Sequence, residues 1–214
     1  MTQHHPDSLI LMEYSAGNLS EPHALCVRLH LEQCPYCRSR VDMLNSLGAV
    51  MMESRPKVSV DDNLFDRLLT RIEEEPSQQD PLEVAFRGQP DPLRKLLGED
   101  LANLPWKRQL GDVSVLDITD HFPGQPERVV LQKLTPGGKA PAHTHRGTET
   151  TVILQGAYTD NKGLFKQWDF IVMGQDDTHK PVATHDEDCI TLSVLSAPLK
   201  LTGRLTRMLN PLIR

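Results

Sequence analysis

The sequence has no run that approaches the roughly 20 consecutive apolar residues of a membrane-spanning helix. It also does not open with the basic and then apolar segment of a secretory signal peptide. Cysteine is scarce: 4 cysteines in 214 residues are too few for a disulfide scaffold of this length. We therefore expect a cytoplasmic protein, whose cysteines are available for metal binding or redox chemistry.

Positive charge is also in deficit, because 23 Lys+Arg stand against 29 Asp+Glu. The resulting net charge of −6 argues against direct DNA binding and suits a protein that binds a basic partner. Residues 1–75 hold most of the excess acidity, with 7 Lys+Arg and 12 Asp+Glu. A hydrophobic content of 38% fits a soluble globular protein, and the length allows one large domain or two small ones.

Helical periodicity dominates the first third of the chain. N-cap residues predict helix starts at Asp7 or Ser8, at Ser20, and at Asp61 or Asp62, and a further helix follows residues 34–37. A unit of about 75 residues has little room for a self-sufficient core, so a metal or a partner must help to stabilise it. The apolar stripes of the third and fourth helices comprise Val41, Leu44, Leu47, Met51, Leu64, Leu68, Leu69 and Ile72.

The spacing of apolar residues changes from a helical to a strand pattern beyond a proline-rich stretch. Residues 76–92 are interpreted as a linker between a helical domain, 1–75, and a second domain, 93–214. Many short strands separated by turn signals predict an all-β sandwich or barrel there. The fold class expected is therefore an α plus all-β two-domain protein. After a lead-in helix at 91–103, strands are expected at 106–110, 113–118, 128–134, 150–155, 168–172 and 189–195.

A first metal motif is His30-x3-Cys34-x2-Cys37, because these are ligand types that zinc prefers and the C-x-x-C spacing lets both thiolates face one ion. Three ligands leave the fourth position of a tetrahedral site unfilled. His5, His23 and Cys26 are the candidates for the fourth position. A thiol redox pair is the alternative, although no βαβ pattern surrounds these cysteines.

A second motif lies at 137–156, where GGKAPAHTHRGTETTVILQG has the spacing G-x5-H-x-H-x3-E-x6-G. Alternate side chains of a strand share a face, so His143 and His145 can bind one cation. Glu149 then begins a β-branched strand. The spacing resembles the first motif of the cupin superfamily, which implies an antiparallel β-barrel and a divalent metal, here zinc, bound by the two histidines, Glu149 and a later histidine, His179.

The region around His179 departs from the cupin pattern. Gly174 and Asp176 occupy positions where the family usually has proline and glycine, and Ala183 replaces an asparagine. His185 or a water molecule is therefore an alternative to His179 as the last ligand.

The two motifs together are similar to the ChrR family of anti-sigma factors, in which a four-helix zinc domain precedes a cupin. His5, followed after 24 residues by HLEQCPYC, resembles the ligand pattern of the zinc-binding anti-sigma domain. The resemblance implies zinc at His5, His30, Cys34 and Cys37, with Cys26 in the core. It further implies that the helical domain occludes an extracytoplasmic-function sigma factor, with Leu64, Leu68 and Ile72 among the contacting residues, until singlet oxygen or oxidative stress is sensed through the cupin.

Two other classes of protein fit parts of the pattern. A three-histidine, one-glutamate cupin resembles dioxygenases and isomerases, and an open metal position can activate oxygen or water. The second class is a redox sensor that acts through Cys34 and Cys37. A fused acidic helical domain favours the regulatory protein, which is not an enzyme.

Overall fold

The computed structural model describes residues 2–74, 92–204 and 206–212. The linker predicted at 76–92 lies outside these residues except for Pro92, the first residue of a helix. In the helical region the Asp7 carboxylate caps the first helix by accepting a hydrogen bond from the Ile10 amide at 2.8 Å. The helices are α1 (Ser8–Ser15), α2 (Glu21–Gln33), α3 (Pro35–Glu53), α4 (Leu64–Glu74) and α6 (Pro92–Leu97), with 3-10 turns η1 (Leu101–Asn103), η2 (Thr119–His121) and η3 (Thr206–Leu212).

The lead-in helix expected at 91–103 is divided into α6 and η1. Gly98, directly after α6, has a φ of +71°, which is favourable for glycine and ends the helix. The helix expected after residue 20 begins there, but Ser20 does not cap it with its side chain. Its hydroxyl instead donates to Glu127 of the β-domain at 3.0 Å.

All strand pairs in the described residues are antiparallel, and they form three sheets rather than one closed sheet. The largest has the order β1-β2-β3-β10-β5-β8, the next β7-β6-β9, and the smallest β11-β4. The bounds are β1 (Lys107–Arg108), β2 (Val113–Asp117), β3 (Arg128–Leu134), β4 (His143–His145), β5 (Glu149–Gln155), β6 (Ala157–Asp160), β7 (Gly163–Lys166), β8 (Phe170–Met173), β9 (Val182–Ala183), β10 (Cys189–Leu195) and β11 (Leu199–Leu201).

The central strands β3, β10 and β5 of the six-stranded sheet are buried on both faces. In β3, Val129 and Leu131 belong to an apolar cluster shared with the helices, whereas Val130 belongs to a second cluster inside the β-domain. At the centre of the sheet, Leu192 pairs with Leu131 on one side and Val152 on the other, and all three are fully buried. Burial of both faces is seen in the consecutive buried residues of β5 and β10, which do not alternate with exposed ones.

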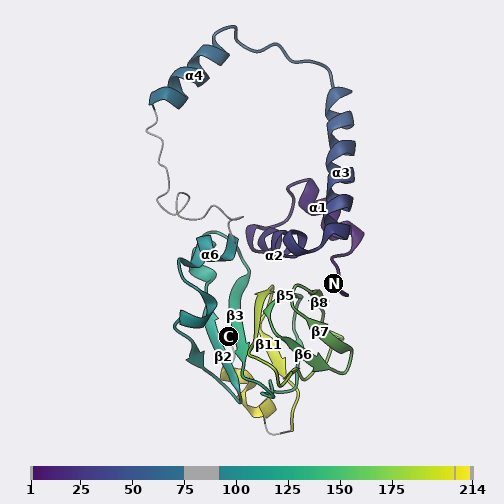
Figure 1. Ribbon diagram of the computed structural model, residues 1–214, viewed down its shortest axis with the longest axis vertical. Helices are drawn as coiled ribbons and strands as arrows, with labels where there is room; N and C mark the ends of the chain where they lie inside the picture. Colours follow the sequence, from purple (N-terminus) through teal and green to yellow (C-terminus); the bar gives the residue numbers. More distant parts are fainter. Residues whose placement is uncertain (1, 75–91, 205, 213–214) are drawn as a thin grey trace.

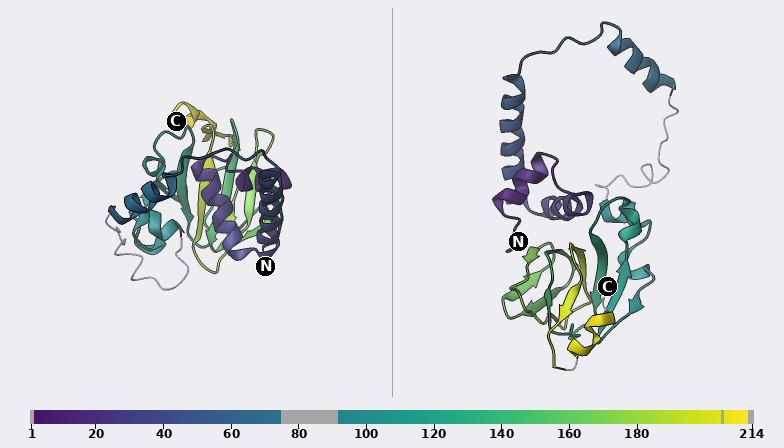
Figure 2. Two further views of the ribbon diagram at one scale, coloured as in Figure 1. Left: turned by 90° about the horizontal axis from the view of Figure 1, so that it is seen from above. Right: turned by 180° about the vertical axis from the view of Figure 1, so that it is seen from behind.

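Helix α2 covers the outer face of this sheet. It contacts β5, β8 and β10, while α1 and α3 pack against one another on its far side (Figures 1 and 2). Residues of α2, including Val27 and Leu29, therefore share one core with the sheet. The independent folding of the two predicted domains stays a prediction.

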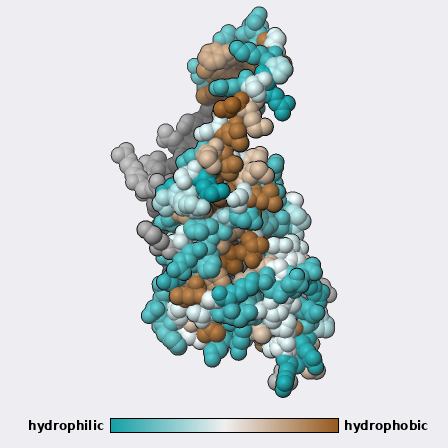
Figure 3. All heavy atoms as spheres, turned by 90° about the vertical axis from the view of Figure 1, so that its right-hand side faces the viewer, coloured by the Kyte–Doolittle hydropathy of each residue, from teal (hydrophilic) through white to brown (hydrophobic). Residues whose placement is uncertain are grey.

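The end of α3 and the whole of α4 stand away from this core (Figure 1). Apolar side chains are exposed along both helices, and Figure 3 shows brown side chains along the part of the molecule where α3 stands above the body. Among the described residues, no helix has the length and apolar character needed to cross a membrane. The exposed residues include Leu47, Val50, Met51, Phe65, Leu68, Leu69 and Ile72.

Candidate metal centres

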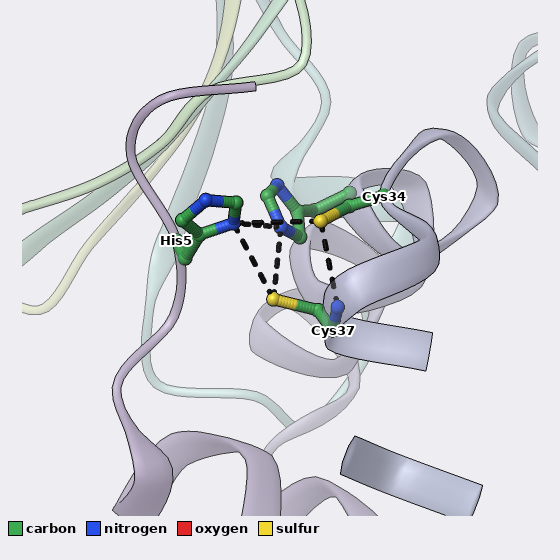
Figure 4. A group of neighbouring side chains, drawn as sticks. His5, Cys34 and Cys37 are labelled. Carbon is green, nitrogen blue, oxygen red and sulfur yellow. Dashed lines mark hydrogen bonds between the residues drawn. The ribbon is translucent and has the colours of Figure 1, made fainter. Parts of the chain in front are cut away.

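The first group of ligands lies where α2, α3 and the N-terminal segment meet (Figure 4). His30 is in the last turn of α2, Cys34 is the residue between the helices, and Cys37 is in the first turn of α3. His5 approaches from the segment that precedes α1. One ligand atom from each of the four residues lies within 4.8 Å of all the others.

The contacts inside this group converge on one point. The Nδ1 atom of His5 is 3.4 Å from the Nε2 atom of His30, 3.4 Å from the sulfur of Cys34 and 3.5 Å from the sulfur of Cys37. The His30 Nε2 atom is 3.4 Å from the Cys37 sulfur. We define these four residues as the first group.

The protonation of His30 is set by the β-domain. Its Nδ1 atom lies 2.7 Å from the backbone carbonyl oxygen of Trp168, which can only accept, so Nδ1 carries the proton. The Nε2 atom therefore presents a lone pair to the group. Burial raises the pKa of the Cys37 thiol to about 12, and the neighbouring Cys34 adds to the shift, so the neutral thiol is favoured unless a cation binds.

The two other candidates for the fourth ligand lie elsewhere. His23 contacts the Ser20 hydroxyl at 2.8 Å and the Glu127 carboxylate at 3.5 Å, both away from the first group. Cys26 is fully buried in the shared apolar core, where burial raises its pKa. The structure therefore brings His5, and neither His23 nor Cys26, to the remaining three ligands.

The second group consists of His143, His145 and His179 inside the β-domain. His143 and His145 are on β4, and residues 143 and 179 form an isolated bridge that brings the third ring over the first two. All three rings are buried, and their ligand atoms lie within 4.8 Å of one another. The strand expected for the His-x-His pair is present.

The tautomers of two of these rings leave lone pairs facing each other. The His143 Nδ1 atom lies 2.8 Å from the carbonyl oxygen of Pro141, and the His179 Nδ1 atom lies 2.9 Å from the Asp160 carboxylate. Both Nδ1 atoms therefore carry protons, and the two Nε2 atoms face each other at 2.8 Å as acceptors. Two lone pairs at this separation repel each other unless a proton or a metal ion lies between them, so the pair can serve as two metal ligands.

Glu149 extends the second group on the side of His145. One of its oxygens lies 3.0 Å from His145 Nδ1, but at an angle that does not allow a hydrogen bond. Neither nitrogen of His145 has a hydrogen-bond partner among the described residues, as expected for a buried ring that serves as a ligand. Burial alone would raise the pKa of Glu149, but the facing His145 and His143 rings and Ser193 outweigh it and lower the pKa to about 2.

His185 is not part of the second group. Its ring is exposed and lies over Gly137, where a Cβ atom would come within 2.6 Å of it. Two cavities adjoin His143: a small one of about 40 Å³, which Glu149 and His179 also line, and an apolar one of about 440 Å³ that extends to Leu209 of η3. The second group therefore has open space beside it.

Comparison with known proteins gives one consistent result. Residues 98–198 match the family model of the ChrR Cupin-like domain. Over 213 residues, 99% of this chain and 98% of the relative, the sequence is 32% identical to the anti-sigma-E factor ChrR of Cereibacter sphaeroides. The chain belongs to the ChrR family. A crystal structure of Rhodobacter sphaeroides SigE in complex with the anti-sigma ChrR matches with a TM-score of 0.74 and 31% identity, over 91% of this chain and 100% of that chain.

Membership of the ChrR family confirms the resemblance found in the sequence, and the predicted fold class with it. Both groups of residues could hold a metal ion, as expected for a ChrR-family chain. Sequence reasoning missed the groups that bond the histidine rings, which are the Asp160 carboxylate and the carbonyl groups of Pro141 and Trp168. A turn signal marks only the position of Asp160, and a backbone carbonyl group has no signature in a sequence.

Proposed function

We propose that this protein is an anti-sigma factor that binds an extracytoplasmic-function sigma factor and occludes the surfaces that the sigma factor uses in transcription. The observation that carries this proposal is the near full-length similarity to an anti-sigma-E factor, which extends through both the helical region and the β-domain. The match to a chain crystallised with SigE supports the same partner class. The role is regulatory rather than enzymatic.

The exposed apolar residues of α4 form the proposed partner surface. Leu68 is 48% exposed and Ile72 is 71% exposed, one helical turn apart, and Leu64 begins the same stripe. Acidic residues such as Asp66 flank the stripe. An apolar stripe with no packing partner among the described elements, on an acidic helix, suits a basic protein partner.

We infer that the first group binds zinc through His5, His30, Cys34 and Cys37. A tetrahedral zinc ion, with bonds of about 2.0–2.1 Å to nitrogen and 2.3 Å to sulfur, holds two nitrogens about 3.4 Å apart and a nitrogen and a sulfur about 3.6 Å apart. The nitrogen-to-nitrogen contact here is 3.4 Å and the nitrogen-to-sulfur contacts are 3.4–3.5 Å. Four protein ligands complete the coordination, so this zinc has a structural role.

The redox-sensor interpretation of the same cysteines is less consistent with their surroundings. A reactive thiol has a lowered pKa, whereas burial raises that of Cys37. Two histidine nitrogens also converge on the sulfur atoms, which a dithiol pair does not need. These features support a metal site at Cys34 and Cys37.

We infer that the second group binds a second divalent ion, which we take to be zinc, through His143, His145, Glu149 and His179. The facing lone pairs of His143 and His179 and the unpartnered nitrogens of His145 support this assignment. In a cytoplasmic regulator, oxidation of the His143, His145 or Cys189 side chain by singlet oxygen, or loss of this ion, would supply the signal for release of the sigma factor. A ligand or modification shifts the equilibrium only if it acts differently on the bound and free states.

The metalloenzyme interpretation also draws on this group and on the apolar cavity beside His143. A fold that resembles enzymes does not establish a reaction, because cupin-like scaffolds carry unrelated functions. The similarity of the whole chain to an anti-sigma factor favours the regulator.

Co-expression of the full chain with its cognate sigma factor tests the proposal. We expect the two proteins to co-purify, the complex to contain two metal ions per chain, and a reporter driven by that sigma factor to be silent. A chain that co-purifies with no sigma factor and leaves the reporter active would exclude the anti-sigma function.

A further inference from the structure

The turn between β7 and β8, residues 166–170, meets the first group of ligands from the side of the β-domain. Trp168 in this turn is the only non-glycine residue with a positive φ, +71°, in the part of the chain that the structure describes. A bulky residue rarely adopts this conformation, so the surrounding contacts must hold it. The carbonyl oxygen of Trp168 accepts the hydrogen bond from His30 Nδ1. The unusual backbone therefore coincides with the group that orients a metal ligand.

Asp169, the next residue, holds the segment that carries His5. One carboxylate oxygen accepts from the amides of Gln3 and His4, at 2.7 Å and 3.1 Å. The other accepts from the Lys166 amide at 2.9 Å and closes the turn. The side chain is 0% exposed, and a carboxylate in this position depends on such hydrogen bonds.

Phe170 continues the same attachment, because its amide donates to the carbonyl oxygen of His4 at 3.0 Å. Three consecutive residues of the β-domain, Trp168, Asp169 and Phe170, thus contact either His30 or the residue next to His5. His30 and the segment that carries His5 thus contact the β-domain, whereas Cys34 and Cys37 lie at the start of α3.

The other side of the turn is bonded to β5. The Trp168 amide donates to the carbonyl oxygen of Ile153 at 2.7 Å, and the Ile153 amide donates to the carbonyl oxygen of Asp169 at 3.3 Å. The same strand begins at Glu149, which lies beside His145 of the second group. One strand therefore joins the surroundings of the two groups.

We propose that Trp168 and Asp169 are positioning residues for the first metal group and that, through β5, they make its hold on the ion depend on the second group. The inference rests on the proposed zinc site and adds a route by which the β-domain acts on the helices. If the turn changes conformation, the carbonyl of Trp168 and the carboxylate of Asp169 move together. Both histidine ligands then lose their orientation while the two thiolates stay in place.

Cobalt(II) in the full-length protein gives a readout that is specific to the first group. Thiolate ligation to cobalt produces charge-transfer absorption, and only the first group contains cysteines. The rate at which a chelator removes this absorption reports how firmly the first group holds its ion. No sigma factor is needed for this measurement.

Gln3 offers a matched pair of variants that leaves the β-domain intact. Gln3→Pro removes the amide proton that Asp169 accepts, while Gln3→Ala keeps it. We expect Gln3→Pro to release cobalt several-fold faster than Gln3→Ala, which should release it at the wild-type rate. Equal rates for the two variants would overturn the positioning role of Asp169.

Asp169→Ala should have a larger effect, a tenfold or greater rise in the release rate, because removal of ligand-orienting partners weakens metal sites by 10–100-fold. Asp112→Ala is the control, since Asp112 accepts one backbone amide bond, from Lys139, elsewhere in the β-domain. It should release cobalt at the wild-type rate. A wild-type rate in Asp169→Ala contradicts the proposal.

Coupling between the groups is measured by adding His145→Ala, which disrupts the second group. In the wild-type background it should speed the release of cobalt from the first group several-fold, and in the Asp169→Ala background it should add nothing further. Equal effects in both backgrounds would exclude the turn as the link. Absence of thiolate-to-cobalt absorption in the wild-type protein would instead refute the proposed metal site itself.

Discussion

The two ligand groups differ in where their side chains originate. The first group draws on two helices and the N-terminal segment and lies against the β-domain, whereas the second lies wholly within the β-domain. The first includes two sulfur atoms and has four convergent donors. The second is built from histidines, with a glutamate at its side and cavities next to it. The first group would thus enclose the ion proposed for it, and the second would leave room beside its own.

This difference suggests a division of labour. Four protein donors leave a tetrahedral ion no free position, so the zinc proposed for the first group would stabilise the fold. An ion with space beside it can exchange a ligand or react, so the second group suits a sensor. Substitutions in one group, with measurements on the other, test this division.

Cys37→Ser should have the largest effect, because it removes a buried thiolate from a closed site. We expect loss of one metal equivalent and no detectable co-purification with the sigma factor, since structural zinc contributes on the order of 10 kcal/mol to the folding of small domains. Metal analysis of the full-length variant and pull-down with the sigma factor measure both. Full inhibition of the reporter by a variant that has lost this ion would end the structural interpretation of the first group.

Leu68→Glu should weaken binding without affecting either ion. The side chain is half exposed, so the free energy of unfolding should change by less than about 0.5 kcal/mol, whereas loss of a central apolar contact at an interface costs about 2 kcal/mol, or more than tenfold in Kd. Titration calorimetry with the sigma factor measures the change. Thr70→Glu, which adds the same charge on the other side of α4, is the control and should bind within about threefold of wild type. Equal losses would mean that charge alone, rather than the apolar stripe, accounts for the effect.

His145→Ala tests the second group. We expect loss of the second metal equivalent, retained binding of the sigma factor, and a reporter that no longer responds to light with a photosensitiser. His185→Ala is the matched control, because His185 is exposed over Gly137 and should leave metal content and response unchanged. An unchanged metal content in His145→Ala would show that the group is misassigned.

The sequence predicts the parts of this molecule that depend on local pattern. Helix starts such as Asp7 follow from capping chemistry, and the long strands β3, β5 and β10 follow from runs of β-branched and apolar residues. The strand expected at 106–110 is only the two residues of β1. Strands β6, β7, β9 and β11 were not predicted, because two to four residues carry too little periodicity.

The candidate ligands were also foreseeable, because histidine and cysteine at fixed spacing indicate a metal. Their surroundings were not. The contact of His30 with Trp168 joins residues 138 positions apart, and that of Gln3 with Asp169 joins residues 166 apart. Such contacts depend on how α2 packs on the sheet, which follows from the shared core rather than from any motif.

His23, at the contact between the helices and the β-domain, should give the smallest effect. Burial lowers its pKa below 6.5, and the nearby Glu127 opposes this shift only in part. The unfolded chain therefore takes up a proton at higher pH than the folded one, so this stabilising contribution is complete above pH 6.5 and declines as pH falls through the lowered pKa. Between pH 7.5 and 5.5, the Tm of His23→Gln should fall less than the Tm of wild type. The difference should be a small part of the whole fall in Tm. His121→Gln, which replaces a histidine in η2 rather than in α2, is the comparison. If His23→Gln and wild type have the same dependence of Tm on pH, protonation of His23 does not contribute to the junction between the two regions.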